Sequence, residues 1–312
     1  MVYTDKKEQA LKNKIIPQTA KEDFEEFWKQ AVGALRQVPI SFTREKLVLP
    51  YKTFDTYEII FNTHDATKVK AYFSVPKQGE KPYPCVVKFH GGGGQRTIEP
   101  AILATGVCCF TMDVRSQGGA TFDKANYEMG NDYIGALMTH NLLCKDSFYM
   151  KNIYLDAVRA VDVVASLPEV DPSKIVTTGE SQGGALSIVA AALSGKVRKA
   201  YPVVPSYGCL ERRVEAGSGV FGAVNKFLLR RPEYTDTAFD TLSYFDINNL
   251  VSLLKVPSCY CLGLADPVCI PEFVYSMYYH TAGPKELYMY PFVPHTIAYE
   301  HHLRLLTEYG QL

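Results

Sequence analysis

A serine between glycines is the strongest chemical signal in the sequence. The run GESQG at residues 179–183 matches the pattern G-x-S-x-G, between a strand-like segment (174–178) and an apolar helical segment (185–193). Glycines two residues before and after the serine remove side chains that would collide in a sharp, strained strand-to-helix turn. The turn exposes the hydroxyl and directs a helix N-terminus at developing negative charge. We therefore predict that Ser181 is a nucleophile for acyl transfer. The alternative is a glycine-rich turn with an idle serine.

The serine needs a base, and histidine is the side chain suited to that task. In the strand–turn–helix context of this motif the chain order is serine, acid, histidine. His295 follows the strand-like segment 286–291 in a short loop, so we predict that it is the base. Its ordinary pKa of about 6.5 predicts that activity falls in acid. The other histidines precede the serine or lie in predicted helices: residues 64, 90, 140, 280, 301 and 302.

The base in turn needs a carboxylate to orient it. Asp266 follows the strand-like segment 259–264, and His295 comes 29 residues later, the length of one strand–helix–strand unit. We predict that Asp266 is the acid. Asp240 and Asp246, which precede that strand, remain alternatives, and a surface Asp-Pro turn at residues 266–267 is the non-catalytic interpretation.

Two glycine- or polar-rich loops could complete the site. The backbone N–H of Gln182 and that of Gly92, in the run HGGGG at residues 90–94, are the predicted oxyanion donors. A phosphate-binding loop is the competing interpretation, but no Lys-Ser/Thr and no G-x-G-x-x-G spacing is present. In the run DVRSQG at residues 113–118, Arg115 and Gln117 either support the nucleophile loop or are solvated.

The elements around these residues indicate an α/β fold. Continuous apolar runs at 84–89, 105–112, 199–204 and 257–264 are typical of parallel strands covered on both faces, and they alternate with helical segments. Alternation over 67–75 predicts a half-buried antiparallel edge strand. A polar arm (1–18) precedes an amphipathic helix with a capping box formed by Thr19 and Glu22. We predict one domain over 1–312, with an N-terminal arm and helix (1–40) and a mostly helical insertion or cap at 208–245.

Composition excludes several other classes of protein. The chain of 312 residues is 47% apolar and 21% charged, with a formal net charge of zero, which excludes a disordered chain and argues against nucleic-acid binding. No apolar run is long enough to cross a membrane, and the first 14 residues lack the apolar core of a secretory signal. The eight cysteines include no C-x-x-C pair, so we expect reduced thiols, no zinc ribbon and a cytoplasmic location.

Taken together, the motifs resemble the acetyl xylan esterase and cephalosporin-C deacetylase family (carbohydrate esterase family 7). That family pairs Arg-Gly-Gln, Gly-x-Ser-Gln-Gly and His-Glu motifs, which correspond here to residues 115–117, 179–183 and 295–296. Segments 23–28, 154–161, 241–246 and 282–286 are also similar, so the resemblance covers about 19–308.

The resemblance implies an α/β-hydrolase fold with an N-terminal extension, assembled as a homohexameric ring around a central chamber. It implies deacetylation of small acetylated sugars, xylo-oligosaccharides and cephalosporins, without a metal or other cofactor. The triad it implies is Ser181, Asp266 and His295, with Arg115 and Gln117 supporting the catalytic loop.

The sequence departs from the family pattern at three positions: Ser116 replaces the glycine of the first motif, Gly92 a tyrosine, and Thr296 a glutamate. We expect these changes to affect substrate preference and assembly more than the reaction. Two alternatives stay open: a hydrolase of other acyl specificity (carboxylesterase or peptidase), and a non-catalytic sugar-binding relative.

Overall fold

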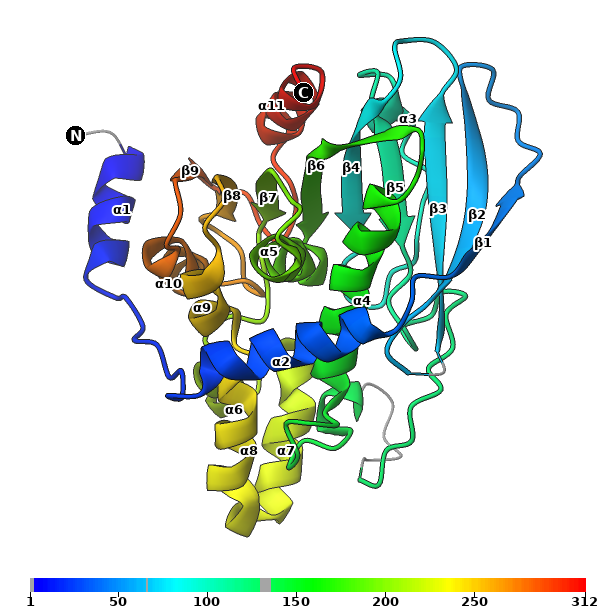
Figure 1. Ribbon diagram of the computed structural model, residues 1–312. Helices are drawn as coiled ribbons and strands as arrows, with labels where there is room; N and C mark the ends of the chain where they lie inside the picture. The colour runs from blue at the N-terminus through cyan, green and yellow to red at the C-terminus, as the bar shows by residue number, and fades with distance from the viewer. Residues whose placement is uncertain (1–2, 66, 130–135) are drawn as a thin grey trace.

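A nine-stranded sheet forms the centre of the molecule in the computed structural model, which describes residues 3–65, 67–129 and 136–312 (Figure 1). The strand order is β1-β2-β3-β5-β4-β6-β7-β8-β9. The strands are β1 Phe42–Lys46, β2 Phe54–Asn62, β3 Lys68–Pro76, β4 Tyr83–Phe89, β5 Cys108–Met112, β6 Val170–Glu180, β7 Lys199–Val203, β8 Ser258–Gly263 and β9 Lys285–Tyr290.

Most of this sheet is parallel, as the continuous apolar runs predict. Strands β5, β4, β6, β7, β8 and β9 pair in parallel, whereas β1, β2 and β3 pair antiparallel with one another and β3 pairs antiparallel with β5. The prediction that 67–75 forms an edge strand is wrong. β3 lies between β2 and β5, and β1, which the pattern does not predict, is the edge. Alternating apolar residues indicate that one face of the strand is buried. They do not indicate whether a neighbouring strand is hydrogen-bonded on each of its two edges.

Helices cover both faces of the sheet. On β6, Thr177 donates a hydrogen bond to the Ser187 carbonyl of α5 (Gln182–Ser194), which packs with α4 (Tyr149–Ala165). On β7, Tyr201 contacts the ring of Tyr309 in α11 (Tyr299–Tyr309), which lies beside α3 (Pro100–Leu103). Because Tyr201 pairs with Thr178, the neighbour of Thr177, α5 and α11 lie on opposite faces.

The N-terminal segment is more ordered than the predicted polar arm. It contains helix α1 (Tyr3–Lys12) and helix α2 (Phe24–Gln37), and α2 packs across α4 and α5 (Figure 1). The predicted capping box is wrong, because the helix begins at Phe24 and the Thr19 backbone N–H instead donates to Asn249 Oδ1 (2.8 Å). The segment between α1 and α2 is therefore attached to α9 (Ile247–Leu250).

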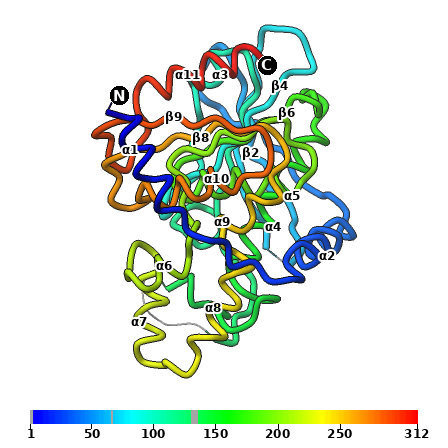
Figure 2. Tube along the Cα trace, turned by 90° about the vertical axis from the view of Figure 1, so that its left-hand side faces the viewer, coloured from blue at the N-terminus to red at the C-terminus, as the bar shows by residue number. Residues whose placement is uncertain are grey.

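Residues 208–245 are mainly helical, as predicted. They contain α6 (Leu210–Glu215), α7 (Gly222–Arg230) and α8 (Thr235–Ser243), which gather at one end of the molecule (Figures 1 and 2). Arg213 of α6 donates to the carbonyl of Val268, in the loop between β8 and α10 (Pro271–His280). Among the described residues, no helix has the length and apolar character needed to span a membrane.

Candidate active site

Ser181 occupies a strained turn between β6 and α5, as its glycine-flanked motif predicts. Its φ and ψ are 56° and −117°, a conformation that L-residues rarely adopt. A Cβ on Gly183 would lie 2.0 Å from the Phe89 carbonyl oxygen, and one on Gly179 would lie 2.5 Å from the same atom. Only glycine fits at both positions, so the backbone of β4 can pass directly beneath the serine.

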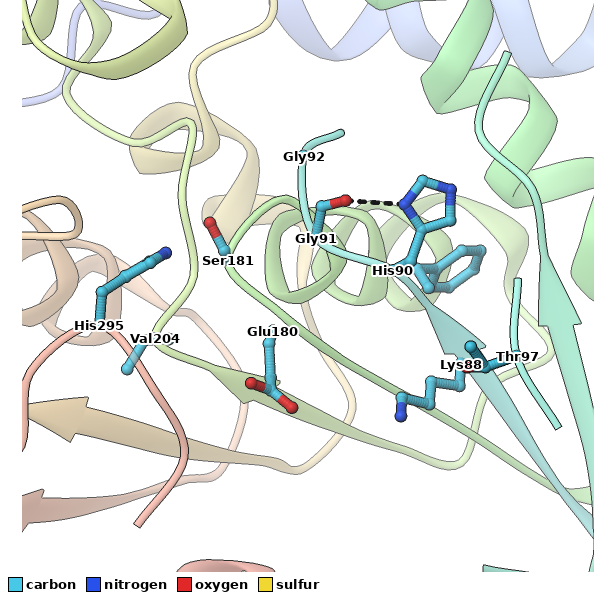
Figure 3. A pocket seen from close by; sticks show the side chains of 10 residues that line it. Lys88, His90, Gly91, Gly92, Thr97, Glu180, Ser181, Val204 and His295 are labelled. Carbon is cyan, nitrogen blue, oxygen red and sulfur yellow. Dashed lines mark hydrogen bonds between the residues drawn. The ribbon is translucent and has the colours of Figure 1, made fainter. Parts of the chain in front are cut away.

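The turn opens into a cavity of about 380 Å³. Ser181 and His295 both line it, and Figure 3 shows the His295 ring directed toward the serine. Within the described residues, the Ser181 hydroxyl makes no hydrogen bond. Serine–base hydrogen bonds often tighten only when substrate is bound. The remaining lining residues are Lys88, Phe89, His90, Gly91, Gly92, Thr97, Glu180 and Val204.

His295 and Asp266 form the predicted pair. Nδ1 of His295 lies 2.8 Å from Oδ2 of the buried Asp266 side chain. The other carboxylate oxygen accepts the backbone N–H groups of Val268 and Cys269, each at 2.8 Å. The hydrogen bond that His295 donates to Asp266, followed by its hydrogen bond with the Cys269 side chain, raises the pKa of His295 from 6.5 to about 10. The protonated imidazole is therefore stabilised. If His295 is the base, the loss of activity on acidification should begin above pH 6.5.

The alternative acids lie elsewhere. Asp240 pairs with Lys21 at an exposed position. Asp246 is buried and caps α9 by accepting the backbone N–H of Asn248 (2.7 Å), and it also accepts those of Cys209 and Leu210. Burial raises the pKa of Asp246 to about 6. Neither residue contacts His295.

The glycine loop borders the same cavity. His90 anchors it: its Nε2 accepts the Val114 backbone N–H (2.9 Å), so its Nδ1 carries the proton and donates to the Gly91 carbonyl (2.7 Å). Burial lowers the pKa of His90, which favours this neutral form. Gly91 passes close to Ser181, with an added Cβ 4.0 Å from the serine Cβ. In the described part of the chain, the backbone N–H groups of Gly92 and Gln182 donate to no protein acceptor.

Gln117 connects the glycine loop to the nucleophile turn. Its side-chain amide pairs reciprocally with that of Gln182, with both N···O distances 2.8 Å. Its Oε1 also accepts the Gly93 backbone N–H (3.2 Å). Tyr207 adds a donor to Gln182 Oε1, and Tyr149 accepts from Gln117 Nε2 (3.1 Å). The two predicted oxyanion loops are thus held together through side-chain amides.

Arg115 acts one step further from the cavity. Its fully buried guanidinium bonds both oxygens of Asp156 (each 2.7 Å), and it also pairs with Asp65 (2.7 Å) and Asp123 (2.9 Å). The Asp156 carboxylate and the other partners raise the pKa of Arg115, against the effect of burial. The Arg115 carbonyl accepts the Tyr149 hydroxyl (2.7 Å). The network therefore fixes the backbone from which Gln117 projects.

Three features of the site escape the sequence analysis. Glu180 and Lys88 line the cavity, and Lys88 pairs with Glu99 at 2.8 Å, whereas the Glu180 carboxylate has no partner among the described residues. Tyr207 reaches Gln182 from the loop after β7. Cys269 lies beside the Asp266–His295 pair. No motif marks Lys88, Tyr207 or Cys269, whereas Glu180 lies inside the serine motif but has no assigned role in it.

Comparisons with known proteins agree with this geometry. The acetyl xylan esterase (AXE1) family model matches residues 1–309. An acetyl esterase, Axe7A of Xylanibacter ruminicola, is 29% identical over 283 residues, which are 88% of this chain and 63% of that protein, so the chain spans under two thirds of this curated relative. The acetyl xylan esterase of Paenibacillus sp. R4 superposes with a TM-score of 0.91 at 31% identity, over 100% of this chain and 99% of that one. Acetyl xylan esterase 1 of Thermoanaerobacterium sp. JW/SL YS485 gives a TM-score of 0.90 at 25% identity, over 97% and 98%.

Proposed function

The chain belongs to the acetyl xylan esterase family, and on that premise we propose that it hydrolyses acetyl esters of xylan-type saccharides through an acetyl-enzyme on Ser181. The observation that carries this proposal is the convergence at one cavity. A strained serine, a histidine paired with a buried carboxylate, and the glycine loop with Gly92 all line it. Among the described residues, the backbone N–H groups of Gly92 and of Gln182, the residue after the serine, donate to no protein acceptor. A binding protein has no use for that combination.

In the acylation step, His295 Nε2 takes the Ser181 proton while the serine oxygen attacks the acetyl carbonyl. The backbone N–H groups of Gln182 and Gly92 stabilise the tetrahedral oxyanion, each by about 3 kcal/mol as in comparable sites. Asp266 holds Nδ1–H, so Nε2 keeps its lone pair toward the serine. The sugar alcohol then leaves with the proton from His295.

Deacylation repeats the sequence with water as the nucleophile. His295 takes a proton from water, the resulting hydroxide attacks the acetyl-enzyme, and Ser181 leaves with that proton as acetate is released. Arg115 and Gln117 contribute by positioning. The Gln117–Gln182 amide pair sets the distance between the two oxyanion donors, and the salt bridges of Arg115 fix the backbone that carries Gln117.

The substrate range extends in this proposal to small acetate esters outside xylan, including cephalosporin-type acetates. Gly92 supports it, because no atom lies within 4 Å of a Cβ built there, so the wall of the cavity is open at this position. An acyl-length series distinguishes this range from that of a longer-chain carboxylesterase or a peptidase. The rate is expected to fall steeply beyond propionyl.

A homohexameric ring in the cytoplasm, with 208–245 as a cap, completes the proposal. The eight cysteines are all free, and thiols stay reduced in that compartment. Sedimentation equilibrium tests the assembly, and fractionation of the native cells tests the location. A monomer in solution would contradict the ring and leave the chemistry of the site unaffected.

The decisive experiment compares 4-nitrophenyl acetate and acetylated xylo-oligosaccharide hydrolysis by the wild type and Ser181→Ala. Ser173→Ala is the matched control, because Ser173 is an exposed serine on the same strand. We expect Ser181→Ala to lose activity by at least about 10³-fold, whereas the control keeps it. Equal, slow rates for all three proteins would contradict an esterase and favour a sugar-binding relative.

A further inference from the structure

A cysteine lies against the Asp266–His295 pair. Among the described residues, a carboxylate oxygen of Asp266, the Sγ of Cys269 and a ring nitrogen of His295 all lie within 4.8 Å of one another. The side chains of Asp266 and Cys269 are buried, and His295 reaches the cavity. The acyl-transfer mechanism makes no use of the thiol.

The donor set selects a particular class of ligand. Thiolate, imidazole and carboxylate together suit Zn²⁺ and its softer analogue Cd²⁺, whereas Mg²⁺ and Ca²⁺ prefer oxygen donors alone. Three protein ligands with a fourth position open to water are a common zinc arrangement.

The bonding of Asp266 leaves the right atom available. Its Oδ1 accepts two backbone N–H groups, from Val268 and Cys269, and these fix the carboxylate in place. Within the part of the chain that the structure describes, its Oδ2 is bonded to His295 Nδ1 alone. A cation can therefore replace the proton between Oδ2 and Nδ1 without breaking the turn that holds the acid.

We propose that Asp266, Cys269 and His295 form a binding site for Zn²⁺ or another thiophilic divalent cation, which reversibly inhibits the esterase. Binding transfers the Nδ1 lone pair to the metal, so the neutral ring carries its one proton on Nε2. That nitrogen then has no lone pair to accept the Ser181 proton. Cys269 binds the metal as a thiolate, so its proton is released to solvent on binding.

Two other places among the residues that the structure describes could bind the same cations. Cys259, Glu286 and Glu308 also lie within 4.8 Å, but the Lys199 ammonium is 2.6 Å from Glu308 and competes with a cation there. Cys144 is the exposed thiol. Both provide controls, because each contains a cysteine that can be replaced without touching the Asp266–His295 pair.

The inhibition readout rests on the proposed esterase activity, and the binding readout is independent of it. Zn²⁺ is titrated into 4-nitrophenyl acetate assays of the wild type, Cys144→Ser, Cys259→Ser and Cys269→Ser, each normalised to its own rate in EDTA. Cd²⁺ is titrated into the same proteins, and the ultraviolet thiolate-to-cadmium charge-transfer band is followed. Mg²⁺ is the control cation, and we expect it to have no effect.

We expect one Cd²⁺ per chain with a thiolate band, and Zn²⁺ inhibition reversed by EDTA, in the wild type, Cys144→Ser and Cys259→Ser. Cys269→Ser should lose the band and raise the half-inhibiting Zn²⁺ concentration at least about tenfold, since loss of an outer-shell partner alone weakens metal binding about 10- to 100-fold. His295→Ala should weaken Cd²⁺ binding similarly, which keeps the test open if Cys269→Ser does not fold.

Absence of a thiolate band in the wild type would overturn the site. So would loss of both the band and the inhibition in Cys144→Ser or Cys259→Ser, because the metal would then bind elsewhere. A protein that shows the band through Cys269 but hydrolyses no ester would support the metal site and contradict the proposed esterase instead.

Discussion

Replacing Asp266 by asparagine tests the central relationship in the site. The pKa of His295 is raised from 6.5 to about 10, with the Asp266 hydrogen bond as the first cause and Cys269 as the second. At about 1.4 kcal/mol per pKa unit the whole effect is about 5 kcal/mol, and the hydrogen bond to Asp266 is its largest contributor. Asparagine also offers an N–H to Nδ1, which favours the ring tautomer that protonates Nε2. We therefore expect kcat/KM to fall about 10³- to 10⁴-fold.

The pH profile separates this explanation from simple misfolding. The base must be neutral, so a raised pKa means that the rate of the wild type rises with pH, with its midpoint above 6.5. In Asp266→Asn that midpoint should move down toward 6.5 as the plateau falls. The assay is phenyl acetate hydrolysis from pH 5.5 to 9.5, with buffer hydrolysis subtracted and Asp240→Asn, at the exposed pair with Lys21, as the matched control. A rate within tenfold of the wild type and an unmoved midpoint would refute the assigned role of Asp266.

Four further predictions follow from individual contacts. Gln117→Leu removes the acceptor of Gln182 Nε2 and should lower kcat/KM about 10- to 100-fold with little change in KM, in steady-state assays. Gly183→Ala should destabilise the protein by at least about 3 kcal/mol in urea unfolding, because its Cβ would overlap the Phe89 carbonyl. Burial lowers the pKa of His301 to about 4, so on acidification the unfolded chain protonates this histidine before the folded protein does. The free energy of unfolding should therefore fall by about 3 kcal/mol between pH 6.5 and 4. Urea unfolding at several pH values should show that His301→Gln removes this loss. The Glu180 carboxylate lines the cavity, where it can accept hydrogen bonds from sugar hydroxyls. Glu180→Gln should therefore lower kcat/KM for an acetylated xylo-oligosaccharide about fivefold more than for 4-nitrophenyl acetate. Equal effects on both esters would contradict a sugar-binding role for Glu180.

The triad could be predicted from the sequence for two reasons. The tight turn at Ser181 requires glycines at fixed positions, and the acid and the histidine follow the serine in a fixed order along the chain. The strained Ser181 turn needs glycines at 179 and 183, and the backbone of β4 beneath it explains why. Asp266 and His295 follow the ends of β8 and β9, which are neighbours in parallel register, so similar positions on the two strands lie side by side. Asp266 and His295, 29 residues apart in the sequence, therefore lie with Oδ2 and Nδ1 only 2.8 Å apart.

The side-chain network around the site could not be predicted in the same way. Gln117 and Gln182 are 65 residues apart, and their pairing depends on β4 lying between β5 and β6, which no local pattern encodes. Tyr207 reaches the same amide from a loop after β7 with no motif of its own. The errors at β1 and at the Thr19 cap have a related cause, because long-range pairing decided both outcomes and the sequence gives only local preference.

The three departures from the family pattern have unequal consequences. Ser116 adopts a φ of 57°, so a serine here occupies backbone that glycine would adopt at lower cost, but it does not line the cavity. Thr296 is exposed and does not line the cavity either. Gly92 alone lines the cavity and has open space around a built Cβ. The triad residues are thus left intact, and the one departure on the cavity wall shares that wall with Glu180, a carboxylate without a partner among the described residues. A change of that kind alters which ester is held at Ser181 while leaving the acyl-transfer step itself unchanged.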